Sequence, residues 1–211
     1  MYARRRFSAL GLLAAVLLLV AVPVFAGEGH SHGDAKASAA QSAQHEAMMA
    51  EMMKYASPGE MHAFLKPLAG TWKTQTTMVM GDQKETSQGM CERAWIMGGR
   101  FLQSKYSGMM AENMPFEGME ILGYDTRKNE LQSTWIDNMG TSISNSSKGS
   151  IDKATKTLTV FTEFFDPMAG KPATYKMVTT IKDDNTHTFA MIGNKEGKDV
   201  TEMEITYTRV K

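Results

Sequence analysis

Side chains that can bind a metal are concentrated near the amino terminus of the sequence. They are the histidines and methionines of one segment: His30, His32, His45, Met48 and Met52. Thioether sulfur suits Cu(I), and imidazole nitrogen suits Cu(II). The segment therefore predicts a copper site. The alternative is a linker followed by an amphipathic helix whose surface carries methionines.

A second group of candidate residues lies in a segment that alternates with period two. Trp135 and Asp137 fall on one face of a predicted strand over 130–138, together with Ser133. An aromatic ring and a carboxylate on one face can stack against a ligand and hydrogen-bond it. The alternative is a core tryptophan and an aspartate that orders the Met139-Gly140 turn by local hydrogen bonds.

Two further segments offer polar candidates for ligand binding. Glu120 and Tyr124 share one face of the segment 115–125, and Glu117 lies on the other, so the pattern leaves open which face is inward. Arg100 follows a Gly-Gly turn, where its guanidinium could bind a ligand carboxylate or neutralise a glutamate inside the fold. The alternative for Arg100 is a salt bridge at the rim, which is worth little.

Buried carboxylates are the remaining candidates for chemistry. Glu92, Glu120 and Asp137 are the residues that could act as a general base or bind a ligand. The sequence has no Gly-x-Ser-x-Gly, no His-Glu-x-x-His and no phosphate-binding loop. We therefore favour a binding protein over an enzyme.

The elements that must position these residues are strands. From Gly70 onward apolar residues alternate with period two, and turn signals separate the segments. Strands joined only by short turns are antiparallel neighbours, and closing them into a barrel removes exposed edges. We predict an all-β, antiparallel up-and-down β-barrel of about ten strands over 68–211. The expected strands are 71–80, 86–97, 100–108, 115–125, 130–138, 141–151, 156–165, 172–182, 186–193 and 199–210.

The first 26 residues have the pattern of a secretory signal peptide. Three arginines at positions 4–6 precede an apolar stretch from Leu10 to Val22, and Val24-Phe25-Ala26 supplies small residues for cleavage. We expect an exported protein, periplasmic or secreted, with no membrane span after signal removal.

Two different segments connect this signal to the barrel. Residues 27–43 are rich in His, Ala and Ser without apolar periodicity, which predicts a disordered linker. Residues 44–66 predict a Met-rich helical segment followed by a short plug helix. The plug helix begins at a Ser57-Pro58-Gly59-Glu60 capping signal and covers one end of the barrel.

Composition excludes some functions and points to a greasy interior. The chain has 211 residues with 23 basic and 23 acidic side chains, a balance that gives no reason to expect nucleic acid as a partner. Cys91 is the single cysteine, so no intrachain disulfide can form. The 19 methionines suit either an adaptable apolar pocket or a core in which Met replaces Leu.

Several segments resemble those of one family. Gly70-Thr71-Trp72 at the first strand and Arg209 near the end of the last resemble the signature of lipocalin-like (calycin) barrels. The wider match includes Trp95-Ile96-Met97-Gly98-Gly99-Arg100-Phe101-Leu102, Pro115-Phe116-Glu117-Gly118, Gly123-Tyr124-Asp125 and Ser133-Thr134-Trp135-Ile136-Asp137-Asn138-Met139-Gly140. From about Met52 to Lys211 the chain is identified as a member of the domain-of-unknown-function 1579 family, which is placed with calycin-like barrels.

The resemblance implies a fold but no established reaction or ligand. It implies that Trp72 closes the bottom of the barrel and that Arg209 packs across its ring. Calycin relatives of the nitrobindin type bind haem through a histidine, which makes His187 a haem candidate. Its position beside the Asp183-Asp184-Asn185 turn signal predicts instead a solvated turn residue.

We therefore expect an exported barrel that binds a small apolar or amphipathic molecule and that needs no cofactor. The alternatives are copper binding through the amino-terminal segment and a barrel enzyme that uses a buried carboxylate.

Overall fold

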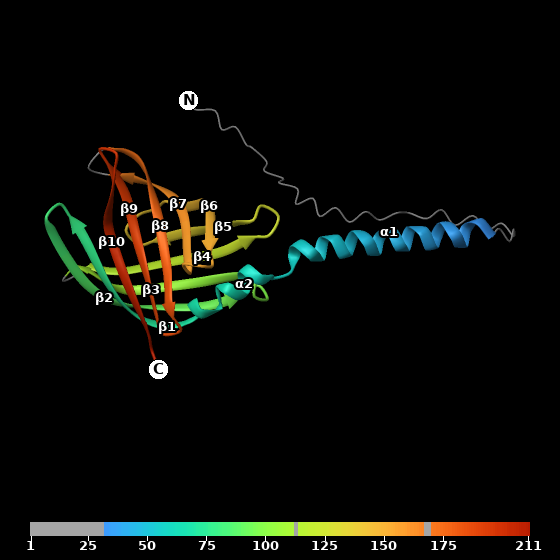
Figure 1. Cartoon of the computed structure of the whole chain (residues 1–211), viewed down its shortest axis with the longest axis horizontal. Coiled ribbons are helices and arrows are strands. Elements are labelled where there is room, and N and C mark those ends of the chain that lie inside the picture. The colour runs from blue at the N-terminus through green and yellow to red at the C-terminus, as the bar shows by residue number, and fades with distance from the viewer. Residues whose placement is uncertain (1–31, 112–113, 167–169) are drawn as a thin grey trace, which may run out of the picture. The chain divides into compact units, whose positions relative to one another are not determined.

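The computed structural model describes residues 32–111, 114–166 and 170–211, and the predicted signal peptide lies outside these ranges. Helix α1 spans His32–Ala56, α2 spans Glu60–Phe64, and the short 3-10 helix η1 spans Lys66–Leu68. Ten strands follow (Figure 1). They are β1 (Gly70–Met80), β2 (Gln83–Ile96), β3 (Phe101–Ala111), β4 (Met114–Asp125), β5 (Glu130–Asp137), β6 (Ser144–Asp152), β7 (Thr157–Asp166), β8 (Lys171–Asp183), β9 (Thr186–Lys195) and β10 (Lys198–Arg209).

The strands form a closed barrel in which each strand pairs with its neighbours in sequence. The order around the barrel is β1-β10-β9-β8-β7-β6-β5-β4-β3-β2, and every pair is antiparallel. The prediction of a ten-strand up-and-down barrel is confirmed. Closure gives β1 and β10 a partner on both sides, so neither presents an unpaired edge.

Part of the segment predicted to be a disordered linker is helical in the structure. Over 32–43, where disorder is predicted, the structure has the first half of α1, and residues 27–31 lie outside the described ranges. The reason is composition: this stretch is rich in alanine, the strongest helix former, although it has no apolar face. Among the described residues, no helix is long and apolar enough to cross a membrane.

The short helices close one end of the barrel, as predicted. Leu65 and Leu68 are at most 2% exposed and join the barrel's main core cluster with Leu102 and Leu131. The cap of α2 differs from the predicted box. Its N-cap is Gly59, whose N–H donates to Nδ1 of His62 at 3.1 Å.

Trp72 and Arg209 fasten this closed end. They face each other in the β1–β10 ladder, and the guanidinium carbon of Arg209 lies 4.1 Å from the centre of the Trp72 ring. Arg209 also donates to the carbonyls of Pro67, Ala69 and Asp184 at 2.6, 2.8 and 2.6 Å. Trp72 is fully buried and donates from Nε1 to the carbonyl of the η1 residue Leu68 at 3.0 Å.

Gly70 is required beside this pair. Its φ is +134°, and a Cβ at that position would collide with Nη1 of Arg209. The first strand therefore begins at a glycine because the guanidinium occupies the space of a side chain.

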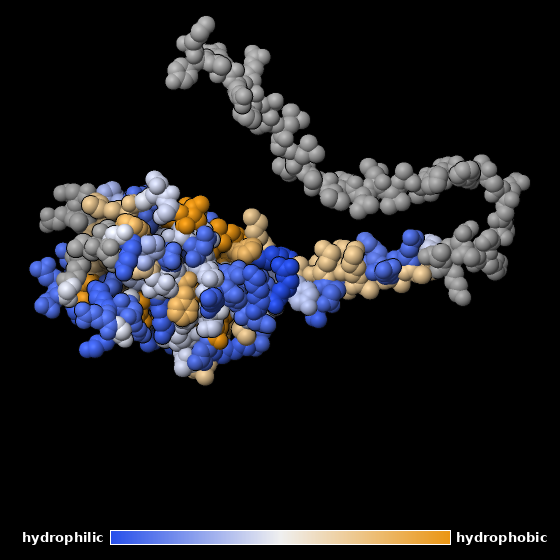
Figure 2. Space-filling model, turned by 90° about the horizontal axis from the view of Figure 1, so that it is seen from above, coloured by the Kyte–Doolittle hydropathy of each residue, from blue (hydrophilic) through white to orange (hydrophobic). Residues whose placement is uncertain are grey.

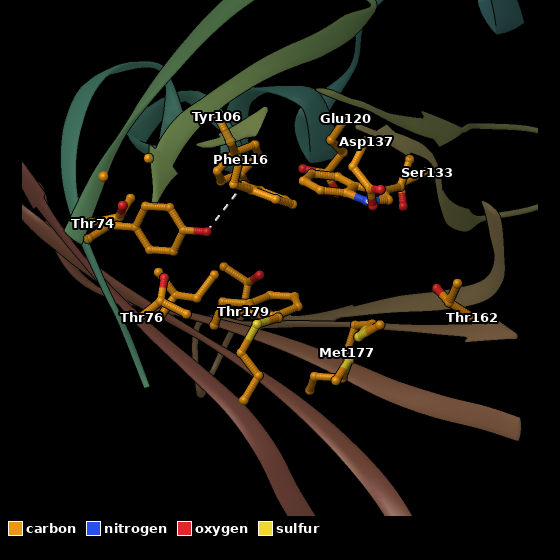
Figure 3. Close-up of a pocket in the computed structure, with 18 of the residues that line it drawn as sticks. Thr74, Thr76, Tyr106, Phe116, Glu120, Ser133, Asp137, Thr162, Met177 and Thr179 are labelled. Atoms are coloured by element: carbon orange, nitrogen blue, oxygen red, sulfur yellow. Dashed lines mark hydrogen bonds between the residues drawn. The ribbon is translucent and has the colours of Figure 1, made fainter. Parts of the chain in front are cut away.

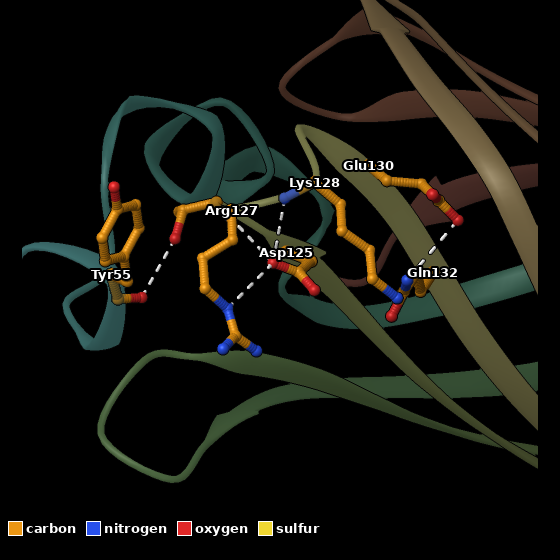
Figure 4. A network of polar contacts seen from close by, with 7 residues as sticks. Tyr55, Asp125, Arg127, Lys128, Glu130 and Gln132 are labelled. Atoms are coloured by element: carbon orange, nitrogen blue, oxygen red, sulfur yellow. Dashed lines mark hydrogen bonds and ion pairs between the residues drawn. The ribbon is translucent and has the colours of Figure 1, made fainter. Parts of the chain in front are cut away.

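The turn between β4 and β5 is ordered by the side chain of an aspartate. In the β4–β5 turn, Oδ1 of Asp125 accepts from the backbone N–H groups of Arg127 and Lys128, and the Thr126 hydroxyl donates to the carbonyl of Tyr55 (Figure 4). Such Asx turns hold loop geometry without help from the core. The face of the barrel seen in Figure 2 is mostly hydrophilic, with smaller apolar patches between the polar residues.

We predict that Trp72→Ala lowers the free energy of unfolding by roughly 3–5 kcal/mol, because it removes a buried ring and its contacts with Arg209. Urea unfolding followed by circular dichroism measures this change. Ile143→Ala, at a side chain that is 67% exposed, is the control and should stay within about 0.5 kcal/mol of the parent. Equal stability of Trp72→Ala and the parent would show that the ring does not fasten the barrel.

Candidate functional site

The barrel encloses a cavity of about 430 Å³ (Figure 3). This volume lies within the range of about 300–1,000 Å³ that is typical of ligand pockets. Most of the wall is apolar. Its apolar side chains include Met78, Leu102, Phe116, Leu122, Leu131, Trp135, Val160, Phe164, Met177, Phe189, Met191, Met203 and Ile205. The barrel is therefore hollow rather than packed solid with methionine.

Arg93 is the charged residue in the depth of this cavity. It points inward from β2 and is only 8% exposed. Its Nε donates to Oγ of Ser104 at 3.1 Å, and its two terminal nitrogens bond Nε2 of His187 at 2.8 Å and the hydroxyl of Tyr106 at 2.6 Å. Its guanidinium carbon also lies 4.8 Å from the centre of the Tyr207 ring.

Arg93 was not predicted from the sequence, although a signal for it exists. Cys91 pairs with Trp72 in the β1–β2 ladder and is fully buried. Because side chains alternate along a strand, an inward Cys91 places Arg93 inward as well. The same alternation places Glu92 on the outer face, where it is exposed. The prediction that Glu92 faces a ligand is therefore wrong.

His187 is a buried core residue, so its prediction as a solvated turn residue is wrong. It is 1% exposed, because β9 begins at Thr186 and directs the next side chain inward. Its ring stacks on Tyr207 at 4.2 Å and meets Trp72 edge-on at 4.3 Å. Burial, followed by the charges of Arg93 and Arg209, lowers the pKa of His187 to about 2, so the ring is neutral.

The hydrogen bond from Arg93 fixes the tautomer of this neutral ring. Nε2 of His187 accepts from the guanidinium, which leaves the proton on Nδ1, and Nδ1 has no hydrogen-bond partner among the described residues. A haem ligand needs a free ring nitrogen directed at the iron. Nε2 is occupied by Arg93, so this histidine does not fit a haem site.

A row of polar side chains runs from Arg93 across the cavity wall. Ser104 accepts from Arg93 and donates to Oε2 of Glu120 at 3.3 Å, and Ser133 also hydrogen-bonds Glu120. From Ser133 the row continues through Oγ of Ser146 at 2.9 Å to Oγ1 of Thr162, a further 2.6 Å away. We call these residues the polar row: Arg93, Ser104, Glu120, Ser133, Ser146 and Thr162.

Glu120 is the carboxylate of the polar row. It points into the cavity from β4, which settles the inward face of that strand. Burial raises its pKa, and this effect is opposed by the charge of Arg93 and by the hydrogen bonds from Ser104 and Ser133. The arginine and the glutamate therefore share one apolar cavity, linked through a serine hydroxyl.

Trp135 and Asp137 both line the cavity, and they also bond each other. Trp135 donates from Nε1 to Oδ2 of Asp137 at 2.6 Å, while Oδ1 accepts from the backbone of Met139 at 2.9 Å. The aspartate thus orders its turn and holds the indole at the same time. The ring stacks on Phe116, with 6.2 Å between the ring centres.

The absence of a side chain at Gly118 leaves room for the Trp135 ring. A Cβ at position 118 would lie 2.5 Å from the indole. Figure 3 shows Glu120, Ser133 and Asp137 on one wall of the cavity and Met177 and Thr179 on the wall opposite.

Two predicted ligand-binding residues lie outside the cavity. Tyr124 is on the inward face of β4 but at the closed end, where its ring meets His62 of α2 edge-on at 6.2 Å. Arg100 donates from Nε to the carbonyl of Ala56 at 2.7 Å and from Nη1 to that of Met97 at 3.1 Å. Both residues therefore fasten the closed end rather than face the cavity.

The predicted copper segment is described only in part. His30 and the side chain of His32 lie outside the description, while His45, Met48 and Met52 are exposed on α1. Among the residues that the structure describes, no three His, Cys, Asp or Glu side chains are grouped so as to hold a metal ion. Copper binding through the histidines and methionines of this segment stays a prediction.

The fold and site define a hollow, up-and-down β-barrel with a polar row in an apolar cavity. The family model described as "Protein of unknown function (DUF1579)" matches residues 57–209, so the chain belongs to that family. This confirms the identification made from the sequence segments. No match is found among curated proteins.

The solved structures that are similar to this chain include two barrel proteins. A redesigned β-barrel is 16% identical, with a TM-score of 0.38, and the match covers 69% of this chain and 94% of that chain. The S-type phycobiliprotein lyase CPES from Guillardia theta is 13% identical, with a TM-score of 0.49, and the match covers 72% of this chain and 94% of that chain. The description of this chain as a barrel rests on its own closed strand order.

We predict that acid destabilises the parent more than the variant His187→Gln. An unfolded histidine takes up a proton near pH 6.5, whereas folded His187 does so only near pH 2. Below pH 6.5 the unfolded state therefore binds more protons, and stability falls as the pH falls.

Urea unfolding at pH 7 and at pH 5 measures this effect. Over that interval the parent should lose about 2 kcal/mol more than His187→Gln, in which the amide oxygen can still accept from Arg93. The other histidines are common to both proteins and cancel. Parallel pH profiles would show that His187 is not held neutral in the core.

Proposed function

We propose that this protein binds a small amphipathic molecule inside its barrel. The observation that carries the proposal is the joint presence of an apolar cavity of about 430 Å³ and a buried polar row on its wall. Ligand pockets of this type combine apolar area for affinity with a few placed polar groups for orientation.

The polar row is costly for the empty barrel. Taking a guanidinium and a carboxylate out of water costs several kcal/mol for each ion, and apolar residues of similar size are often as stable or more stable in such places. Stability alone therefore gives little reason to keep Arg93 and Glu120 inside a barrel. A ligand that uses these groups supplies the reason.

Methionines make the rest of the wall adaptable. Met78, Met177, Met191 and Met203 line the cavity from four different strands. A methionine side chain is unbranched and can change rotamer at small cost, so such a wall fits chains of different shape. Part of the high methionine content of the sequence therefore lines the pocket.

The ligand's route is the end of the barrel opposite α2. Met109, Met110 and Phe165 line the cavity, and their side chains are also 43%, 40% and 65% exposed. These three apolar side chains form the mouth. An apolar molecule that reaches the mouth gains from moving out of water onto these apolar side chains.

The site supports binding better than catalysis. A general base needs a lone pair directed at substrate, whereas Glu120 is already bonded by Ser104 and Ser133 and lies within the field of Arg93. The signal-like residues 1–26 support an exported binding protein, which acts in the periplasm or outside the cell.

We expect the parent to bind the neutral dye Nile red with a stoichiometry near one, with a rise in dye emission. Thr76 faces the cavity and Thr77 does not, so Thr76→Phe fills space that Thr77→Phe leaves open. Thr76→Phe should weaken binding about tenfold, which corresponds to about 1.4 kcal/mol, and Thr77→Phe should leave it unchanged.

Fluorescence titration measures both variants, and circular dichroism checks that each has the parent's fold. A parent protein that does not bind the dye, or equal affinities in the two phenylalanine variants, would contradict binding inside the barrel.

A further inference from the structure

The hydrogen bonds of Arg93 leave part of its guanidinium unused. The group carries five N–H donors. Ser104, His187 and Tyr106 each accept from one of them, and the Cys91 side chain also hydrogen-bonds the guanidinium. These four contacts leave at least one N–H donor of a terminal nitrogen without a partner among the described residues. Arg93 lines the cavity, so a molecule inside it can reach this group.

None of the hydrogen-bond partners of Arg93 carries a negative charge, and burial raises the pKa of the Cys91 thiol. His187 is neutral, as shown above, and burial raises the pKa of Tyr106 well above its usual value, so its hydroxyl stays protonated. Among the described residues, no carboxylate forms an ion pair with Arg93. Glu120 is linked to it only through the Ser104 hydroxyl.

A buried guanidinium in this condition lacks its preferred partner. Arginine pairs best with a planar anion that accepts from two of its nitrogens at once, and such charge-assisted bonds are about twice as strong as neutral ones. By contrast, the carboxylate of Glu120 already accepts from two hydroxyls. The unfilled position in the cavity is therefore one for an anion and not for a cation.

The charges that face the cavity limit the charge of that anion. One guanidinium faces it, and Glu120 on the same wall adds negative charge, so a dianion such as a phosphate monoester would remain poorly compensated in a low-dielectric cavity. A carboxylate carries a single charge. From Arg93 the apolar wall leads to the mouth at Met109 and Phe165, which suits an unbranched apolar chain.

We propose that the ligand is an aliphatic carboxylic acid, bound head first, with its carboxylate on Arg93 and its chain along the methionine-lined wall. This inference rests on the proposed function, because it names the class of molecule that the same cavity takes. The Tyr106 hydroxyl beside Arg93 is a second group that the carboxylate can reach.

Displacement of Nile red by three molecules of one chain length tests the head group. Decanoate, decan-1-ol and decylamine are compared at pH 8. The aliphatic chain contributes equally to the affinity of all three molecules. Water solvates the two ions better than the alcohol, so each ion loses more hydration when it enters the cavity. We expect decanoate to bind at least about tenfold more tightly than decan-1-ol, with decylamine the weakest, because only decanoate can make charge-assisted hydrogen bonds with Arg93.

Two variants should change this preference in opposite directions. Arg93→Gln should weaken decanoate about a hundredfold and leave decan-1-ol within about threefold. Glu120→Gln removes a negative charge from the same cavity while keeping the shape, so decanoate should bind more tightly and decan-1-ol unchanged. Glu117→Gln, an exposed site on the outer face of the same strand, is the matched control and should alter neither.

The outcomes separate this inference from the proposed function. Binding of Nile red with equal displacement by decanoate and decan-1-ol, or with decylamine the best competitor, overturns the carboxylate inference and leaves the barrel a binding protein. Failure of the parent to bind the dye or any of the three chains overturns both. Should Arg93→Gln not fold, the comparison of head groups and the response of Glu120→Gln still decide the question.

Discussion

The positive charge of Arg93 is buried inside the barrel, and the polar row on the inner wall begins at this residue. A buried guanidinium must be hydrogen-bonded, because an unpaired charge in an apolar medium is far too costly. Two other strands supply the hydrogen-bond acceptors, which are Ser104, Tyr106 and His187. The Ser104 hydroxyl in turn donates a hydrogen bond to Glu120. The hydroxyls that continue the polar row to Thr162 satisfy one another in turn.

Arg209 lies against Trp72 and Arg93 against Tyr207, and these two arginines have different roles. Arg209 lies over the Trp72 ring and donates to three backbone carbonyls, so it fastens the ends of β1, η1 and the β8–β9 turn together. Arg93 has only neutral hydrogen-bond partners, and at least one of its donors has no partner among the described residues. The comparison within one chain separates an arginine that closes the fold from one that is available to a ligand.

The architecture could be predicted from the sequence, but most of the site could not. Period-two alternation and turn signals predict the ten strands that the structure contains. The site depends on contacts across the barrel. Arg93 and His187 are 94 residues apart, and no local pattern reports that they meet.

The errors about individual residues have local causes. The acidic turn before β9 made His187 look solvated, although strand alternation resumes at once and turns its ring inward. Arg100 drew attention because it follows two glycines, yet its guanidinium is engaged by carbonyls at the closed end. Trp135 and Asp137 could be proposed from one strand face, whereas the alternation in 115–125 left the inward face open and only the structure places Glu120 in the cavity.

The most direct test of a head-first carboxylate inside the barrel is a crystal structure of the protein with decanoate. We expect electron density for the chain along Met177 and Met191, with both carboxylate oxygens within hydrogen-bond distance of the terminal nitrogens of Arg93. A chain bound with its carboxylate in solvent at the mouth, or a cavity filled only by water, would contradict this account.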